Sequence, residues 1–171
     1  MDVSLFIRLA ALLGAIFILA AALSSAFSLK LARRLKKPFT TVHHPLAIIG
    51  GLLIVLHPLL VAWQLKSARI LVPNFSSWRT FWTMGGCTAL VLVALAVIAA
   101  LLMHRMPRFW RWGHCLIYPA MLLAGIHGLR MGRDLANPLL ATFLGVLLVL
   151  ALAVFFYKRI NKPKAAPAPS K

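Results

Sequence analysis

The stretch HHPLAIIGGLLIVLH, residues 43–57, opens an apolar run that continues without a charged residue to Leu65. The run Pro45–Leu65 is about as long as the ~20 residues that a helix needs to cross the hydrocarbon core of a bilayer. An amphipathic helix of a soluble protein would show charged side chains every three or four residues, and this run shows none. The run therefore predicts a membrane-spanning helix.

Four other charge-free runs have the same character, and they cover Leu9–Leu29, Thr80–Met103, Trp112–Leu129 and Leu135–Tyr157. The chain is 62% hydrophobic, above the roughly 45–50% of soluble domains. We therefore expect an all-α integral membrane protein, with a five-helix bundle in residues 1–160 and a disordered cytoplasmic tail in residues 161–171. The expected helices cover residues 4–29, 42–66, 80–104, 109–130 and 135–158.

The basic residues lie between the apolar runs. The chain has 19 lysines and arginines and a formal net charge of +17, which by itself would also suit a nucleic-acid-binding protein. Thirteen of the 19 fall on one side of the predicted membrane, in residues 30–37, in residues 105–111 and after residue 157. By the positive-inside rule, this distribution predicts an N-terminus outside and a C-terminus in the cytoplasm of a bacterial inner membrane.

Few residue types in the chain are able to carry chemistry. The only acidic residues are Asp2 and Asp134, so the sequence offers no paired carboxylates for acid–base work. Cys87 and Cys115 lack CxxC or metal-ligand spacing. What remains is histidine, and five of the six histidines lie in or beside two of the predicted spans: His43, His44, His57, His114 and His127. Ionisable side chains at membrane depth usually mark function.

The histidines form two pairs with similar spacing. His57 follows His43 by 14 residues, and His127 follows His114 by 13, so each pair is about 20 Å apart along its helix. The 42–66 and 109–130 helices run in the same direction, because one helix lies between them. His43 (or His44) is therefore expected at the depth of His114, and His57 at the depth of His127. Facing neutral imidazoles at two depths suit the axial ligands of two b-type haems between these helices.

The helical angles favour His43 over His44 as a ligand. Fourteen residues fall about 40° short of four full turns, so His43 and His57 share one face of an ideal helix. Thirteen residues leave His114 and His127 about 140° apart, and bending or unwinding of the helix at Pro119 would reduce this offset. Glycines occur near these histidines, where they permit close approach of a macrocycle or of another helix: Gly50, Gly51, Gly113, Gly125 and Gly128.

Residues 40–130 resemble the ferric reductase-type transmembrane cytochrome b domain. The resemblance rests on histidine pairs at 14 and 13 residues on two parallel helices that are separated by one span. The stretch HHPLA at residues 43–47 is similar to that family's His-x-x-Leu-small pattern, which implies that His43 is the ligand and that His57, His114 and His127 are the others. The chain departs from the family in lacking one N-terminal helix and any flavin or nicotinamide domain.

The expected function is electron transfer across the bilayer by a di-haem b-type cytochrome, as a subunit of a larger oxidoreductase complex. The redox partners would be a flavoprotein, a cytochrome or reductase subunit, or quinol. A quinol-oxidising anchor subunit, a metal or haem transporter and a non-catalytic assembly subunit are alternatives. Arg105 and Arg130 are candidate partners of the haem propionates, although each also suits a topology charge. His104 suits an interfacial position.

Overall fold

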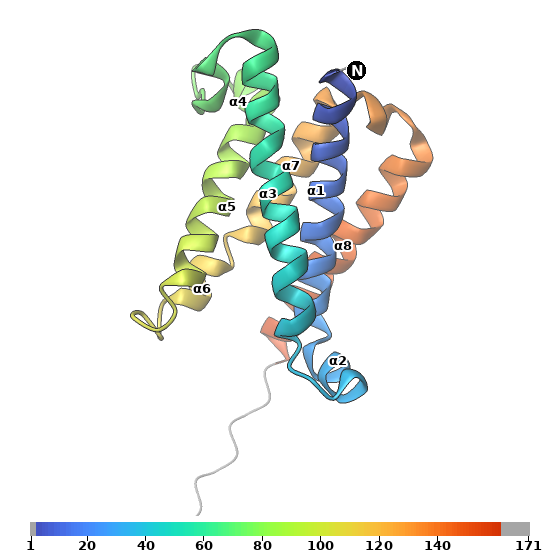
Figure 1. Cartoon of the computed structure of the whole chain (residues 1–171), viewed down its shortest axis with the longest axis vertical. Coiled ribbons are helices and arrows are strands. Elements are labelled where there is room, and N and C mark those ends of the chain that lie inside the picture. The colour runs from blue at the N-terminus through green and yellow to red at the C-terminus, as the bar shows by residue number, and fades with distance from the viewer. Residues whose placement is uncertain (1–2, 162–171) are drawn as a thin grey trace, which may run out of the picture.

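The computed structural model describes residues 3–161, and within this range it contains helices and turns but no strand (Figure 1). Three helices are long and apolar enough to cross a membrane: α1 (Val3–Ala26), α3 (Thr40–Leu65) and α8 (Pro138–Ile160). The prediction of an all-α membrane protein is therefore confirmed at this level. The predicted tail covers residues 161–171, and all of it except Asn161 lies outside the described residues.

The third and fourth predicted helices are each divided. The expected helix 80–104 becomes α4 (Trp78–Thr83) and α5 (Gly85–Leu101), and the expected helix 109–130 becomes α6 (Trp110–His114) and α7 (Ile117–Met131). Figure 1 shows α1, α3, α5, α7 and α8 running alternately between the two ends of the molecule. These five helices follow one another in the predicted order, but α5 and α7, at 17 and 15 residues, are shorter than expected.

Local sequence explains where these helices begin and end. The Ser77 side chain accepts a hydrogen bond from the Thr80 amide and starts α4, while Gly85 and Gly86 favour a break at Met84 because glycine has low helix propensity. The side chain of Asn137 caps α8, and Pro138 takes its first position, where a missing N–H does no harm. Helix α8 therefore starts three residues later than predicted.

Short helices connect the long helices at the two ends of the bundle. The first predicted helix ends early, and α2 (Ser28–Leu35) follows it before Lys36 turns the chain in the left-handed conformation. Lys66 ends α3 in the same way. Two short 3₁₀ helices lie at the other end of the molecule, η1 (Ala68–Leu71) before α4 and η2 (Arg133–Ala136) before α8.

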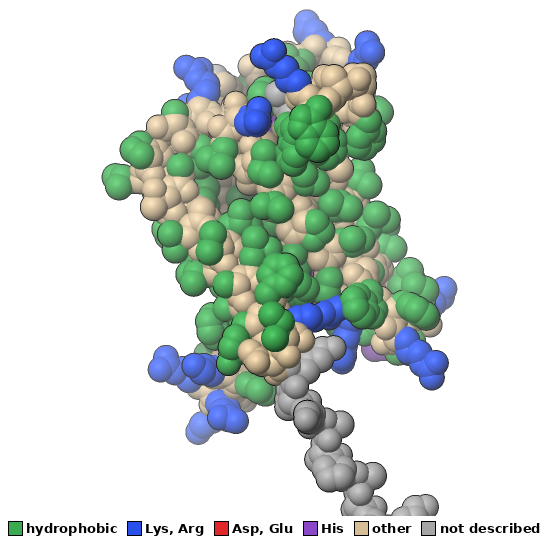
Figure 2. Space-filling view, turned by 180° about the vertical axis from the view of Figure 1, so that it is seen from behind, with side chains coloured by type: hydrophobic (Ala, Val, Ile, Leu, Met, Phe, Trp, Pro, Cys, Tyr) green, Lys and Arg blue, Asp and Glu red, His purple; other side chains and the backbone are tan. Residues whose placement is uncertain are grey.

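The packing is suited to lipid. The most buried residues of the described chain are small, with Ala96 and Ala120 at 0% and 1% exposure, whereas large apolar side chains such as Leu52 and Leu139 are 67% and 81% exposed. Figure 2 shows hydrophobic side chains over the middle of one face, with lysines and arginines gathered toward its two ends. Small residues inside and large apolar residues outside are typical of helices that pack within a bilayer.

The helices associate in two pairs. Helices α1 and α3 lie antiparallel along much of their lengths, and α5 packs against α7. Helix α8 contacts both α1 and α7, and these three helices share the main buried cluster: Ile18, Leu19, Ala22, Met121 and Ala151. Between the two pairs, α3 makes only limited contact with α5 and does not pack extensively against α7. The predicted histidines lie on α3 and on the α6–α7 segment that face each other across this division.

Candidate functional site

One predicted histidine pair lies together in the structure. His43, in the first turn of α3, and His114, at the end of α6, have ring centroids 6.3 Å apart with an angle of 78° between the ring planes. The two rings come from segments separated by 71 positions in the chain, at the end of the molecule that also holds α2. Both side chains are half-buried. The structure thus places these imidazoles at one depth, on facing elements.

The spacing of this pair suits a metal ion held between two imidazoles. Each metal–nitrogen bond is about 2 Å long, and the centroid of each imidazole lies about 1 Å beyond its nitrogen. Two imidazoles on opposite sides of one metal ion therefore have ring centroids about 6 Å apart. Within residues 3–161 there is no cluster of three or more histidine, cysteine or acidic side chains that would complete a protein-only metal site. A haem iron needs only two protein ligands, because the macrocycle supplies the other four. The donor set therefore fits haem better than a bare metal ion.

Hydrogen bonds fix which nitrogen of each ring is available. His43 Nδ1 lies 3.0 Å from the carbonyl oxygen of Ala21 on α1, and His114 Nδ1 lies 3.1 Å from that of Ala96 on α5. A carbonyl oxygen only accepts, so in each neutral imidazole Nδ1 carries the proton and donates it. Nε2 then carries the lone pair that binds a metal. A ligand histidine typically donates its other ring N–H to such an acceptor.

His57, near the far end of α3, is held in the same way. Its Nδ1 lies 3.0 Å from the carbonyl oxygen of Ile7 on α1. Ile7 precedes Ala21 by 14 residues, which equals the separation of His43 and His57. Because α1 and α3 are antiparallel, α1 presents one carbonyl to each histidine of α3. Both histidines of this helix therefore have Nε2 as the nitrogen available for a ligand.

Two buried glycines allow α1 and α3 to come this close. Gly14 lies midway between the two residues of α1 whose carbonyl groups accept these bonds, and Gly50 lies midway between the two histidines on α3. A Cβ atom at Gly50 would meet the backbone nitrogen of Ile18 at 3.0 Å, and one at Gly14 would meet the backbone nitrogen of Ile54 at 3.2 Å. Such contacts are tighter than ordinary van der Waals packing, so any larger residue would push the helices apart.

His127, the fourth predicted ligand, packs against the start of α5. A Cβ atom at Gly86 would lie 2.9 Å from both Cδ2 and Nε2 of the His127 ring, so only glycine leaves room for this imidazole. The structure therefore brings the rings of one predicted pair, His43 and His114, together, and it packs the ring of His127 against Gly86.

The break between α6 and α7 changes the angle between His114 and His127. Backbone hydrogen bonds of the tighter i→i−3 type bridge this segment, from Cys115 to Trp112, from Leu116 to Gly113 and from Tyr118 to Cys115. Each such residue turns by about 120° instead of 100°, so three or four of them remove about 60–80° of the expected 140° offset. The predicted helix 109–130 is therefore divided and not continuous. Pro119 contributes to the break, because it lacks the N–H that would bond to the carbonyl of Cys115 four residues earlier, and Tyr118 bonds to that carbonyl instead.

The remaining predicted residues lie at the ends of the molecule. His44 is exposed and tilted beside His43, with ring centroids 5.9 Å apart, and it has no contact with α1 of the kind that His43 makes. His104 and Arg105 are exposed in the turn after α5, at the end that holds the His43–His114 pair. Arg130 is exposed in the last turn of α7, three residues after His127. Arg105 is thus at the end of the molecule that holds His43 and His114, and Arg130 is near His127 at the opposite end.

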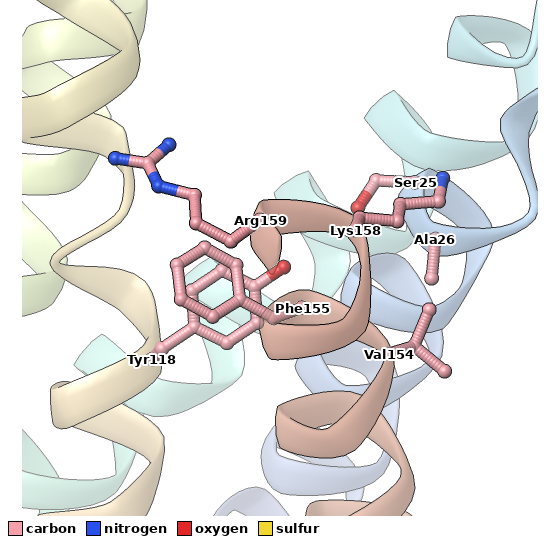
Figure 3. Close-up of a pocket in the computed structure, with 7 residues that line it drawn as sticks. All are labelled: Ser25, Ala26, Tyr118, Val154, Phe155, Lys158 and Arg159. Carbon is pink, nitrogen blue, oxygen red and sulfur yellow. The ribbon is translucent and has the colours of Figure 1, made fainter. Parts of the chain in front are cut away.

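A cavity of about 190 Å³ lies near the His43–His114 pair, between the ends of α1, α7 and α8 (Figure 3). Ser25 and Tyr118 contribute hydroxyl groups, and Lys158 and Arg159 contribute positive charge. The Tyr118 ring stacks on Phe155 with centroids 4.0 Å apart. Ser25 directly follows Ser24, whose Oγ is 3.4 Å from His43 Nδ1, and Tyr118 lies one turn beyond His114. The cavity is therefore at the same end of the molecule as the histidine pair.

Several of these features were not predicted from the sequence. The carbonyl acceptors on α1 and α5 are backbone groups, and no residue type marks them in the sequence. Gly113, in contrast, was one of the glycines expected to permit close approach: a Cβ atom there would lie 2.6 Å from Ala99 Cβ, so glycine lets α6 approach α5 and brings His114 to Ala96. The adjacent glycines at positions 85 and 86 were a visible signal for the His127 site.

Comparison of the chain with protein families, with curated proteins and with solved structures gives no match. Its function is therefore inferred from the chemistry of the histidines and of the helices that hold them.

Proposed function

We propose that this protein is a di-haem b-type membrane cytochrome that crosses the bilayer five times and carries electrons across it as a subunit of a larger redox complex. The observation that carries the proposal is the His43–His114 pair, with ring centroids 6.3 Å apart and each Nδ1 held by a backbone carbonyl. A structural histidine that merely joins helices would need one of these bonds, but it would have no reason to face a second imidazole at metal-binding distance.

Each part of the chain has a role in this proposal. His43 and His114 would bind the iron of one haem, and His57 and His127 would bind that of the other, at positions about 21 Å apart along α3. A haem at each position supplies a one-electron carrier. Carbonyl groups on α1 and α5 hold the proton on Nδ1 of three of the ligands.

The orientation in the membrane follows from the charges. The end that holds α2 and the α5–α6 turn is rich in lysine and arginine, and under the positive-inside rule this end, with the His43–His114 pair, would face the cytoplasm. A membrane-impermeant thiol reagent should label a Lys171→Cys variant only after the membrane is opened. Labelling of intact cells would reverse the assignment of the two pairs to the two membrane faces.

The experiment that tests the function is an absorption spectrum of the purified protein, oxidised and reduced with dithionite, together with a pyridine haemochrome assay. We expect the spectrum of low-spin b-type haem and two haems per chain. A protein that is folded, as judged by its helical circular dichroism, and holds no haem would exclude the proposal.

A second candidate function is supported by the cavity near the His43–His114 pair. A quinol headgroup is a flat ring with two oxygen atoms, and the cavity offers the aromatic face of Phe155 with hydrogen-bonding groups on Tyr118 and Lys158. Its position would bring a quinol close to the cytoplasmic-side haem. The protein would then be a quinol-oxidising anchor subunit, and its electron donor would come from the membrane itself.

The two tyrosines of the chain provide a matched test of this second candidate. Tyr118→Phe should slow haem reduction by a soluble quinol such as duroquinol by about tenfold without loss of haem, whereas Tyr157→Phe, at an exposed position on α8, should not slow it. Equal rates in the wild type and both variants would show that the cavity is not a quinol site.

A further inference from the structure

The two carbonyl groups that hold the histidines of α3 differ in one respect. Ser24 Oγ donates a hydrogen bond of 2.7 Å to the Ala21 carbonyl, the same oxygen that accepts from His43 Nδ1 at 3.0 Å. The Ile7 carbonyl, which accepts from His57 Nδ1, has Ala10 in the corresponding position three residues later. Ala10 is buried and has no hydroxyl group. Serine and alanine thus distinguish two otherwise equivalent arrangements, 14 residues apart on α1.

The number of donors at each carbonyl follows from this difference. A carbonyl oxygen has two lone pairs. Each oxygen already accepts the amide N–H of the residue four positions later in the helix, so the Ile7 oxygen serves two donors and the Ala21 oxygen serves three. When three donors share one acceptor, each bond is weaker. The Ser24 oxygen itself lies 3.4 Å from His43 Nδ1, beyond the usual 2.7–3.2 Å of an N–H···O bond, so it adds little as a second acceptor. The N–H of His43 is therefore held less strongly than that of His57.

We propose that Ser24 is a positioning residue that tunes the haem iron bound by His43, raising its reduction potential relative to that of the haem bound by His57. The proposal rests on the proposed di-haem function. A strong hydrogen bond from Nδ1–H makes a ligand imidazole more basic, which stabilises the ferric state and lowers the potential. By weakening that bond at His43, the Ser24 hydroxyl acts in the opposite direction. The two haems then differ in potential even though all four ligands are histidines.

The size of the effect follows from hydrogen-bond energies. Loss or gain of one shared hydrogen bond of about 0.5–1.5 kcal/mol changes an equilibrium constant by about twofold to tenfold. We expect a threefold change in the one-electron reduction equilibrium, which corresponds to about 28 mV at 59 mV per tenfold. A change of this size is measurable in a spectroscopic redox titration.

Exchange of the two residues gives the test. Ser24→Ala should lower the reduction equilibrium constant of the His43-bound haem about threefold, and hence lower its potential. Ala10→Ser should raise the reduction equilibrium constant of the His57-bound haem by a similar factor. Ser24→Thr keeps a hydroxyl group that bonds back to the preceding turn, and it should retain the wild-type potential. A His57→Ala variant, which keeps only the His43-bound haem, assigns the two steps of the titration.

The outcomes separate this proposal from the function on which it rests. If the wild type binds two haems and Ser24→Ala leaves both potentials unchanged, shifts both equally or raises that of the His43-bound haem, then the role of Ser24 is excluded and the cytochrome function stands. If the wild type binds no haem, both proposals fail. If Ala10→Ser does not fold, Ser24→Ala and Ser24→Thr still decide the role of Ser24.

Discussion

The α1–α3 pair and the α5–α6–α7 segment hold histidines by different means. Helix α3 is continuous, so a spacing of 14 residues alone brings His43 and His57 to one face, where α1 supplies an acceptor for each. The other segment is divided, and His114 and His127 belong to separate helices. Their positions depend on a tightened turn and on glycines that admit a close neighbour. Regular helix geometry therefore suffices for one half of the site, while the other half depends on local irregularities.

The largest expected effect comes from the centre of the α1–α3 pair. Gly50→Ala places a Cβ atom 3.0 Å from the backbone of Ile18, which has no room to move, so it should destabilise the protein by about 1–3 kcal/mol and weaken haem binding at both pairs. Gly51→Ala is the matched control, because a Cβ atom there meets nothing within 4 Å and alanine favours a helix by about 0.5–1 kcal/mol.

Thermal unfolding of the detergent-purified variants, followed by circular dichroism, would measure this difference. Equal melting temperatures for the Gly50 and Gly51 variants would show that close contact with α1 does not hold α3.

A smaller effect, confined to one haem, is expected in the divided half. Gly86→Ala places a Cβ atom 2.9 Å from the His127 ring, whereas Gly85→Ala places one no closer than 3.8 Å to any neighbour. The first variant should change the electron paramagnetic resonance signal of one haem or remove that haem, because the ring must move, and the second should leave both signals as in the wild type. Loss of the His43–His114 haem in Gly86→Ala would contradict the separation of the two pairs.

The smallest expected effect tests the contact that joins the start of α1 to the α7–α8 connection. Arg8 Nε lies 3.0 Å and 2.9 Å from the two carboxylate oxygens of Asp134, and this hydrogen bond holds the pKa of Asp134 below its ordinary value of 3.8. Because the folded-state pKa is lowered, the stabilisation is complete above pH 3.8 and is lost as the pH falls through the lowered pKa.

Asp134→Asn should therefore lower stability by about 1 kcal/mol or less at pH 7, because the pair is partly exposed. Melting temperatures measured from pH 7 down to pH 3 should converge for the variant and the wild type at the acidic end. A difference that persists unchanged at pH 3 would show that the charge of Asp134 is not its cause.

Sequence reasoning succeeded where helices are regular. The apolar runs predicted the all-α membrane fold and, within a few residues, the bounds of α1, α3 and α8, because lipid imposes a continuous apolar length. It did not find the break at Met84, since apolar composition continues through it, and it attributed an irregularity to Pro119 without locating the division at Cys115. It also missed the part played by α1, whose contribution to the histidines comes from backbone carbonyls that no residue type reveals.

The haem count of single-histidine variants tests the central claim most directly. Alanine at His43, His57, His114 or His127 should reduce the pyridine haemochrome value from two haems per chain to one, with His43 and His114 losing the same haem and His57 and His127 the other. His44→Ala and His104→Ala should keep both haems, since these exposed side chains lie outside the pairs. Loss of a haem in the His44 variant, with both haems retained in the His43 variant, would contradict the pairing derived from α1, α3 and α6.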